Sequence, residues 1–108
     1  MASYMIQCSY GPAAIAGLIK KPTDRSDAVK ALVGQIGGKL VGSWMSFGEY
    51  DAVFIVEGAA AVDAAAVSMA VTASGAFRAF KTTPLLSMAE GVEAMRKAAT
   101  IGYAPPGA

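Results

Sequence analysis

Histidine is absent from this chain of 108 residues, and cysteine occurs once, as Cys8. Without imidazole, the sequence has no Ser-His or Cys-His nucleophilic machinery and no histidine ligands for a metal. A single thiol forms no internal disulfide and builds no cysteine-based zinc site. These absences exclude large classes of hydrolases and structural metal proteins, and we predict no metal site and no cofactor.

Charged residues are also scarce. They make up 16% of the chain and leave a net charge of +1, whereas a typical globular protein has about 25%. Because so small a positive charge attracts phosphate weakly, we predict no nucleic-acid partner. No apolar stretch approaches the roughly 18 residues that cross a bilayer, and the N-terminal residues lack the basic start and apolar core of a signal peptide. We therefore expect a cytoplasmic protein with no membrane partner.

Apolar residues, by contrast, are abundant. They form 55% of the chain, compared with about 45–50% in an average globular protein. Alanine supplies part of this excess, and alanine favours helices while burying little area. The remainder is more apolar surface than one small domain normally hides.

The hydrophobic pattern predicts a chain that alternates between strands and helices. Apolar residues with period two indicate strands, and apolar residues at i, i+3 and i+4 indicate helices. Thr23 is expected to cap the second helix, Gly37-Gly38 to end it, and Pro84 to end the last strand. By residue number, we expect strands at 3–10, 39–47, 50–57 and 76–83, and helical segments at 13–19, 23–36, 59–73 and 87–98.

This order predicts an α+β fold of the ferredoxin-like βαββαβ type, with helices on one face of a four-stranded antiparallel sheet and an added C-terminal helix. Residues 1–100 would form this single domain, and residues 101–108 a tail that contains proline and glycine.

Such a sheet leaves one face without helices. Residues 52–56 are nevertheless apolar at every position, so both faces of their strand should be covered. Aromatic side chains on the other strands, namely Trp44, Phe47, Phe77 and Phe80, add to this apolar surface. Either the C-terminal helix folds back over the open face, or a further copy of the chain covers it. We favour a homodimer or higher oligomer formed through the open sheet face.

Three short motifs resemble those of a known family. The sequence Gly-Glu-Tyr-Asp at 48–51, followed by an apolar strand, is similar to the Gly-x-Tyr-Asp motif that gives the GYD domain family its name. Pro22 and Arg25 resemble the family's Pro-x-x-Arg, and residues 37–40 resemble its Gly-Gly-basic-apolar start of the second strand. The resemblance extends to about Glu90 and implies a ferredoxin-like fold of the dimeric α/β-barrel type. It implies no catalytic residue, because the family's biochemical role is unassigned.

Within the family-like motif, Tyr50 and Asp51 have two interpretations. They can be turn residues whose side chains bond nearby backbone as the strand enters the sheet. Alternatively they lie at the rim of a pocket, where the tyrosine donates to a carbonyl and the aspartate acts as a base.

Arg25 is a third candidate, because a cation near the start of a helix is disfavoured by the helix dipole. Its position therefore indicates a specific partner, which is Asp51, Glu57 or a ligand carboxylate. Trp44 would supply an aromatic wall. The predicted ligand-binding residues are Arg25, Trp44, Tyr50 and Asp51, and no residue is predicted to be catalytic.

Two functional classes remain after these exclusions. The chain is either a non-catalytic oligomeric binding or assembly module, with room for a small apolar or aromatic ligand, or a cofactor-free isomerase or monooxygenase of the dimeric α/β-barrel type. Fold analogy alone supports the enzyme, and one fold hosts many activities. We therefore favour the binding or assembly module over the enzyme.

Overall fold

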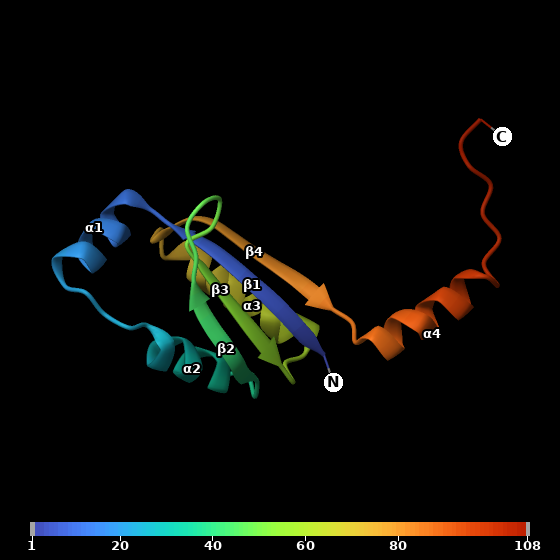
Figure 1. Ribbon diagram of the computed structural model, residues 1–108, viewed down its shortest axis with the longest axis horizontal. Helices are drawn as coiled ribbons and strands as arrows, with labels where there is room; N and C mark the ends of the chain where they lie inside the picture. The colour runs from blue at the N-terminus through green and yellow to red at the C-terminus, as the bar shows by residue number, and fades with distance from the viewer. Residues whose placement is uncertain (1, 108) are drawn as a thin grey trace.

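The computed structural model describes residues 2–107, which form four strands and four helices (Figure 1). In chain order the elements are β1 (Ser3–Tyr10), α1 (Pro12–Lys20), α2 (Ser26–Gly34), β2 (Lys39–Met45), β3 (Ala52–Glu57), α3 (Ala61–Ala73), β4 (Phe77–Leu85) and α4 (Met88–Ala98). None of these helices is long and apolar enough to cross a membrane.

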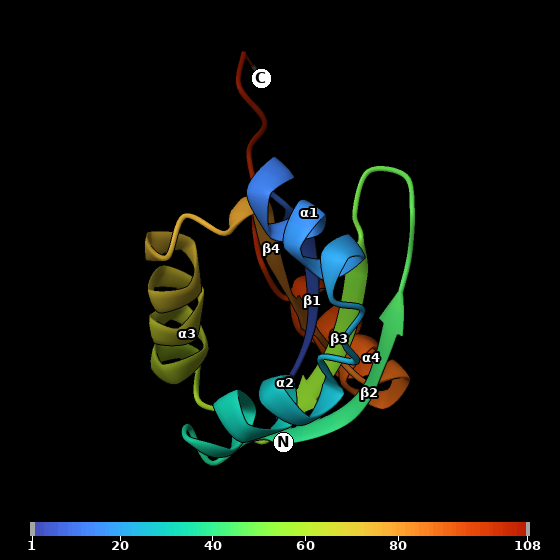
Figure 2. The ribbon, with the colours of Figure 1, turned by 90° about the vertical axis from the view of Figure 1, so that its left-hand side faces the viewer.

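The four strands form one sheet in the order β2-β3-β1-β4, and every neighbouring pair is antiparallel. The strands at the centre, β3 and β1, come from opposite halves of the βαββαβ unit, as the split βαβ arrangement requires. The predicted ferredoxin-like α+β fold with an added C-terminal helix is therefore confirmed. Figure 2 views this sheet from the end at which α1 lies, with α4 behind it.

The covered face of the sheet is the one on which α2 and α3 pack. From β3 it receives Ala52, Phe54 and Val56, all of which are buried. The helices contribute Val33 of α2 and Val67 of α3, the buried residue of each helix. Apolar side chains from three elements are thus buried between the sheet and the helices.

The opposite, open face carries the side chains of β3 that alternate with the buried ones. Val53 and Ile55 are only half-buried, and Trp44 of β2, which pairs with Val53, keeps 55% of its surface exposed. The indole of Trp44 lies against Gly42, where an added Cβ would come within 2.5 Å of the ring atom Cη2. Glycine at position 42 thus lets the ring lie flat on the sheet.

Two aromatic residues of β4 belong to the covered face. Phe77 and Phe80 pack against the core around Cys8, and the ring of Phe77 stacks on Tyr10 with 5.1 Å between centroids. An irregularity in the pairing after Ser9 places Phe77 opposite Tyr10 and Phe80 opposite Cys8. The expectation that these two rings add to an uncovered apolar surface is therefore wrong.

The last helix, α4, projects away from the sheet (Figure 1). It begins with a capping box, in which Ser87 Oγ accepts from the Glu90 N–H at 3.0 Å and Glu90 Oε1 accepts from the Ser87 N–H at 2.9 Å. Met88 and Met95 on this helix are 91% and 71% exposed. The radius of gyration of 17.3 Å exceeds the roughly 13 Å of a compact chain of this length. Thus α4 does not fold back over the open face of its own sheet.

The start of α2 differs from the predicted cap. Arg25, not Thr23, is the N-cap residue, and its side chain makes no capping bond. The Thr23 hydroxyl instead donates to the Lys21 carbonyl at 2.8 Å, and Asp24 Oδ1 accepts from the Ser26 N–H at 2.8 Å. Because the carboxylate of Asp24 satisfies the first free N–H, the helix begins two residues later than Thr23 would allow.

The strand ends also differ from prediction at two places. Pro84 lies inside β4 and pairs with Tyr4, because β4 is an edge strand and an edge tolerates a missing N–H. The connection between β2 and β3 spans residues 46–51 and is longer than the predicted two-residue turn. The left-handed stop after α2 is confirmed, with Gly37 at φ +69°.

Candidate functional site

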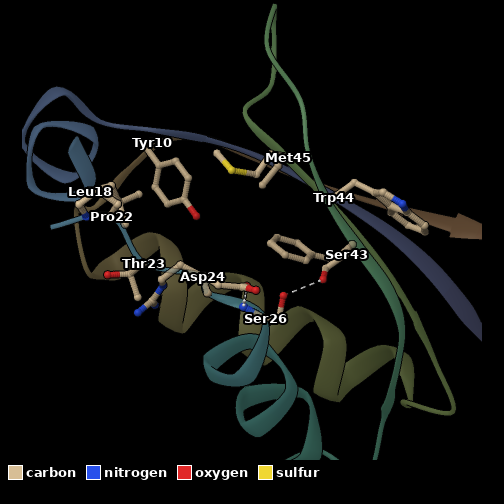
Figure 3. Close-up of a pocket in the computed structure, with 12 residues that line it drawn as sticks. Tyr10, Leu18, Pro22, Thr23, Asp24, Ser26, Ser43, Trp44 and Met45 are labelled. Atoms are coloured by element: carbon tan, nitrogen blue, oxygen red, sulfur yellow. Dashed lines mark hydrogen bonds between the residues drawn. The ribbon is translucent and has the colours of Figure 1, made fainter.

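A cavity of about 560 Å³ lies on the covered face, between the α1–α2 connection and the strands β2 and β3 (Figure 3). Its apolar walls include Leu18, Met45 and Phe54. Its polar groups come from the end of β1, from the start of α2 and from β2, at Tyr10, Thr23, Asp24, Arg25, Ser26 and Ser43. A concave apolar space with a few convergent polar groups is the usual form of a small-molecule site.

Two further cavities adjoin the first. One of about 590 Å³ lies between α1 and α3, and one of about 110 Å³ lies between α2, α3 and the sheet. Tyr10 and Arg25 line all three cavities. These two side chains therefore stand where the three spaces meet, and we call them the Tyr10–Arg25 junction.

The end of β1 positions Tyr10. Gly11 follows it and donates its N–H to the Ala76 carbonyl at 2.8 Å, which ties this end of β1 to the start of β4. Stacking on Phe77 orients the ring, and the hydroxyl reaches towards the α1–α2 connection (Figure 3). Burial raises the pKa of Tyr10, with smaller contributions from the charges of Cys8 and Asp51, against an opposing effect of Arg25. The hydroxyl is therefore a neutral hydrogen-bond donor at physiological pH.

Asp51 hydrogen-bonds the 46–51 connection to the backbone of β1. Its Oδ2 accepts from the Tyr10 N–H at 2.9 Å, its own N–H donates to the Cys8 carbonyl at 2.8 Å, and its carbonyl accepts from the Ser46 N–H at 2.8 Å. Two hydroxyls add to these bonds: Ser9 Oγ donates to the Glu49 carbonyl at 2.6 Å, and Ser46 Oγ donates to the Tyr50 carbonyl at 2.8 Å. The Gly-Glu-Tyr-Asp segment is thus hydrogen-bonded to the end of β1. This arrangement matches the first interpretation of Tyr50 and Asp51, in which they are turn residues beside nearby backbone.

The structure separates the four predicted site residues. Arg25 lies at the junction of the cavities. Trp44 borders the first cavity, but its indole points away from Tyr10 onto the open face (Figure 3). Tyr50 and Asp51 lie in the 46–51 connection, outside the lining of these three cavities. Arg25 therefore shares the first cavity with Tyr10 and with the edge of Trp44, whereas Tyr50 and Asp51 lie outside it.

The partner expected for Arg25 within the chain is not found. Among residues 2–107, the ion pair that forms is the exposed one between Lys97 and Glu93, at 3.8 Å. Arg25 pairs with neither Asp51 nor Glu57 in this part of the chain. Its guanidinium remains available to a molecule in the cavity.

Sequence reasoning missed Tyr10 and the serines at the cavity floor. Ser26 and Ser43, from α2 and β2, place their hydroxyl oxygens 3.2 Å apart (Figure 3). Tyr10 looked like one more residue of an alternating strand, and its only local signal was the Gly-Pro that follows it. Pairing of a strand end with a helix start is a tertiary feature that no local pattern contains.

Cys8 is the only thiol, and it lies beneath this site in the core. Burial, with a smaller effect of the Asp51 charge, raises the pKa of Cys8 from its ordinary value of 9.0 to about 11. The thiol is therefore protonated and unreactive at neutral pH. Within residues 2–107, acidic and cysteine side chains form no group of three that would hold a metal ion.

Comparison with known proteins supports the fold and the family-like motifs. The model of the GYD domain matches residues 4–95. No curated protein matches the chain. A solved structure described as an uncharacterized NIPSNAP domain protein from Burkholderia xenovorans superposes with a TM-score of 0.52 at 16% identity, over 82% of this chain and 96% of that one. The crystal structure of FFRP-DM1 gives 0.50 at 13% identity, over 80% of this chain and 100% of that one. At these identities the likeness concerns the fold alone.

Proposed function

The chain belongs to the GYD domain family, and from that premise we propose that it is a homo-oligomeric binding module for a small apolar or aromatic molecule. The observation that carries the proposal is the cavity of about 560 Å³ beside the Tyr10–Arg25 junction. Its volume falls in the range of about 300–1,000 Å³ that small-molecule sites occupy. Its walls are largely apolar, and a few polar side chains line it beside them.

The assembly part of the proposal rests on the open face. Val53, Ile55 and Trp44 present apolar surface that neither α4 nor any other helix of the same chain covers. A standard protein interface buries about 800 Å² on each partner, an area that one face of a four-stranded sheet can supply. A second copy of the chain has the same apolar face, so two copies can cover each other's open faces without another protein.

A titration followed by two-dimensional NMR tests the binding function. Indole and benzyl alcohol serve as aromatic probes, and we expect shifts confined to residues around the cavity. Ser43→Phe places a ring in the cavity and should abolish these shifts. Thr72→Phe adds the same ring on an exposed position of α3 that lies outside the lining residues, and should leave them intact. Shifts that survive Ser43→Phe would place the probes elsewhere and refute the proposed site.

Light scattering tests the assembly. We expect a mass above 11.0 kDa, the mass of one chain, at micromolar concentration. A monomer at that concentration would refute the assembly part of the proposal and leave the binding part to its own test.

The alternative is a cofactor-free isomerase or monooxygenase in which Asp51 acts as a base. It needs the Asp51 carboxylate to face a substrate, yet Oδ2 accepts from the Tyr10 N–H and the residue lies outside the lining of the three cavities. The binding module requires no such rearrangement, and we favour it for that reason.

A further inference from the structure

We infer that the Tyr10–Arg25 junction is a carboxylate-binding site, and that the ligand is a small organic acid with an apolar body. This inference rests on the proposed binding function and narrows it to one chemical class. Three features of the junction carry it: an unpaired guanidinium, a neutral hydroxyl donor and an apolar space on both sides.

The first feature is the charge of Arg25. Guanidinium offers donors in a fixed fork that matches the two oxygens of a carboxylate. Among residues 2–107, no carboxylate forms an ion pair with Arg25. Asp24 lines the first cavity together with Arg25, but its Oδ1 accepts from the Ser26 N–H, and Asp51 Oδ2 accepts from the Tyr10 N–H.

The second feature is the Tyr10 hydroxyl. It shares all three cavities with Arg25, and burial keeps it protonated. A hydroxyl donor beside a guanidinium suits an anion, because both groups donate and neither needs to lose a proton. Lys21 lines the cavity between α1 and α3 and adds a second positive charge on that side.

The third feature selects an organic acid over an inorganic anion. Phosphate or sulfate requires donors around several oxygens. The hydroxyls that line the first cavity are engaged within the chain, since Thr23 donates to the Lys21 carbonyl and Ser26 and Ser43 bond to each other. Much of the remaining space beyond the junction is bounded by Leu18, Met45 and Phe54 on one side and by Leu32 and Phe77 on the other. These walls suit a ring or a short hydrocarbon chain. A carboxylate at the junction would leave its apolar body in contact with them.

Calorimetric titration with 3-phenylpropanoate and its neutral amide, 3-phenylpropanamide, tests the inference on the full chain. The two probes share shape and apolar body and differ in charge. We expect the acid to bind at least about tenfold more tightly, because a charge-assisted pair contributes more than a neutral hydrogen bond. We also expect excess inorganic phosphate not to displace it.

Three variants assign the effect to the junction. Arg25→Gln should weaken binding of the acid by about tenfold or more and leave the amide unchanged, and Arg25→Lys should restore part of the loss. Tyr10→Phe should weaken the acid several-fold. Arg78→Gln removes an exposed arginine of β4 that lines none of the three cavities, and should have no effect. Circular dichroism checks that each variant is folded.

The outcomes separate this inference from the proposed function. Equal binding of acid and amide, or equal losses in Arg25→Gln and Arg78→Gln, would overturn the carboxylate site while the binding module stands. Displacement by phosphate would also overturn it. Binding of neither probe here, together with no shifts from indole or benzyl alcohol, would overturn both.

Discussion

The two faces of the sheet carry similar apolar side chains and have opposite surroundings. Along β3, Phe54 and Val56 are buried beneath α2 and α3, while Val53 and Ile55, which alternate with them, are half-exposed on the open face. A strand that is apolar on both sides is typical of a sheet covered on both sides. One chain therefore lacks a layer that covers the open face of its sheet. Residues on the covered face stabilise the fold, and residues on the open face are available for assembly.

The largest effect on stability is expected on the covered face. Phe54→Ala removes a buried ring and leaves a cavity, which should cost about 3–5 kcal/mol of the free energy of unfolding. Urea denaturation at two protein concentrations measures it. The same loss should appear at both concentrations, because the ring packs within one chain. A loss below about 1 kcal/mol would show that the covered face is not the core.

The neighbouring residue on the open face should behave in the opposite way. Ile55→Asp places a charge where a second copy is proposed to pack, so we expect the oligomer to dissociate to a folded monomer. Light scattering gives the mass, and circular dichroism confirms the fold. Ile19→Asp is the matched control, since Ile19 is 74% exposed on α1, away from the open face. An oligomer that persists in Ile55→Asp would move the interface off this face.

A smaller effect is expected where the 46–51 connection is bonded to β1. Asp51→Ala leaves the Tyr10 N–H without its acceptor and should cost about 1–3 kcal/mol, because that bond is partly buried. Asp51→Asn keeps an acceptor oxygen, so its loss should be smaller. Thermal unfolding ranks the two variants. An Asn variant as damaged as the Ala variant would show that charge, not the hydrogen bond, is what matters at this position.

The sequence predicted the fold because its signals are local and agree with one another. The alternation in β1, the left-handed Gly37 and the Ser87 cap each depend on a few neighbouring residues, and the structure has all three. Phe77 and Phe80 show the limit. They lie three apart, so period two puts them on opposite faces, and only the irregular pairing with β1 brings both to the covered face.

The candidate site was harder to predict for the same reason. Arg25 was found because a cation at a helix start violates a local rule. Tyr10 violates none, and its importance depends on how the α1–α2 connection passes over the end of β1. Trp44 was expected as a wall of the site, but its neighbours Ser43 and Met45 take the covered face, so alternation directs its indole to the open one.

The pH dependence of the free energy of unfolding tests whether water is excluded from the core around Cys8. The folded-state pKa of Cys8 is about 11 and the ordinary value is 9.0, so between these values the folded chain binds more protons than the unfolded chain. The free energy of unfolding should therefore fall as pH rises from 9 to 11. Tyr10 contributes in the same direction, and Cys8→Ala isolates the thiol by flattening the slope in part. An unchanged slope in Cys8→Ala would mean that water reaches this core.

The smallest effect is expected in α4, which packs on neither face of its own sheet. Ser87→Ala removes the hydroxyl that accepts from the Glu90 N–H and should weaken the helix by about 1 kcal/mol. Because α4 projects from the body, circular dichroism should show reduced helicity while the unfolding midpoint of the sheet stays the same. Thr100→Ala is the control, since Thr100 follows the helix and its hydroxyl donates to the Lys97 carbonyl, so it satisfies no free N–H at the helix start. If Ser87→Ala instead dissociates the proposed oligomer, α4, with its exposed Met88 and Met95, would be part of the interface between copies.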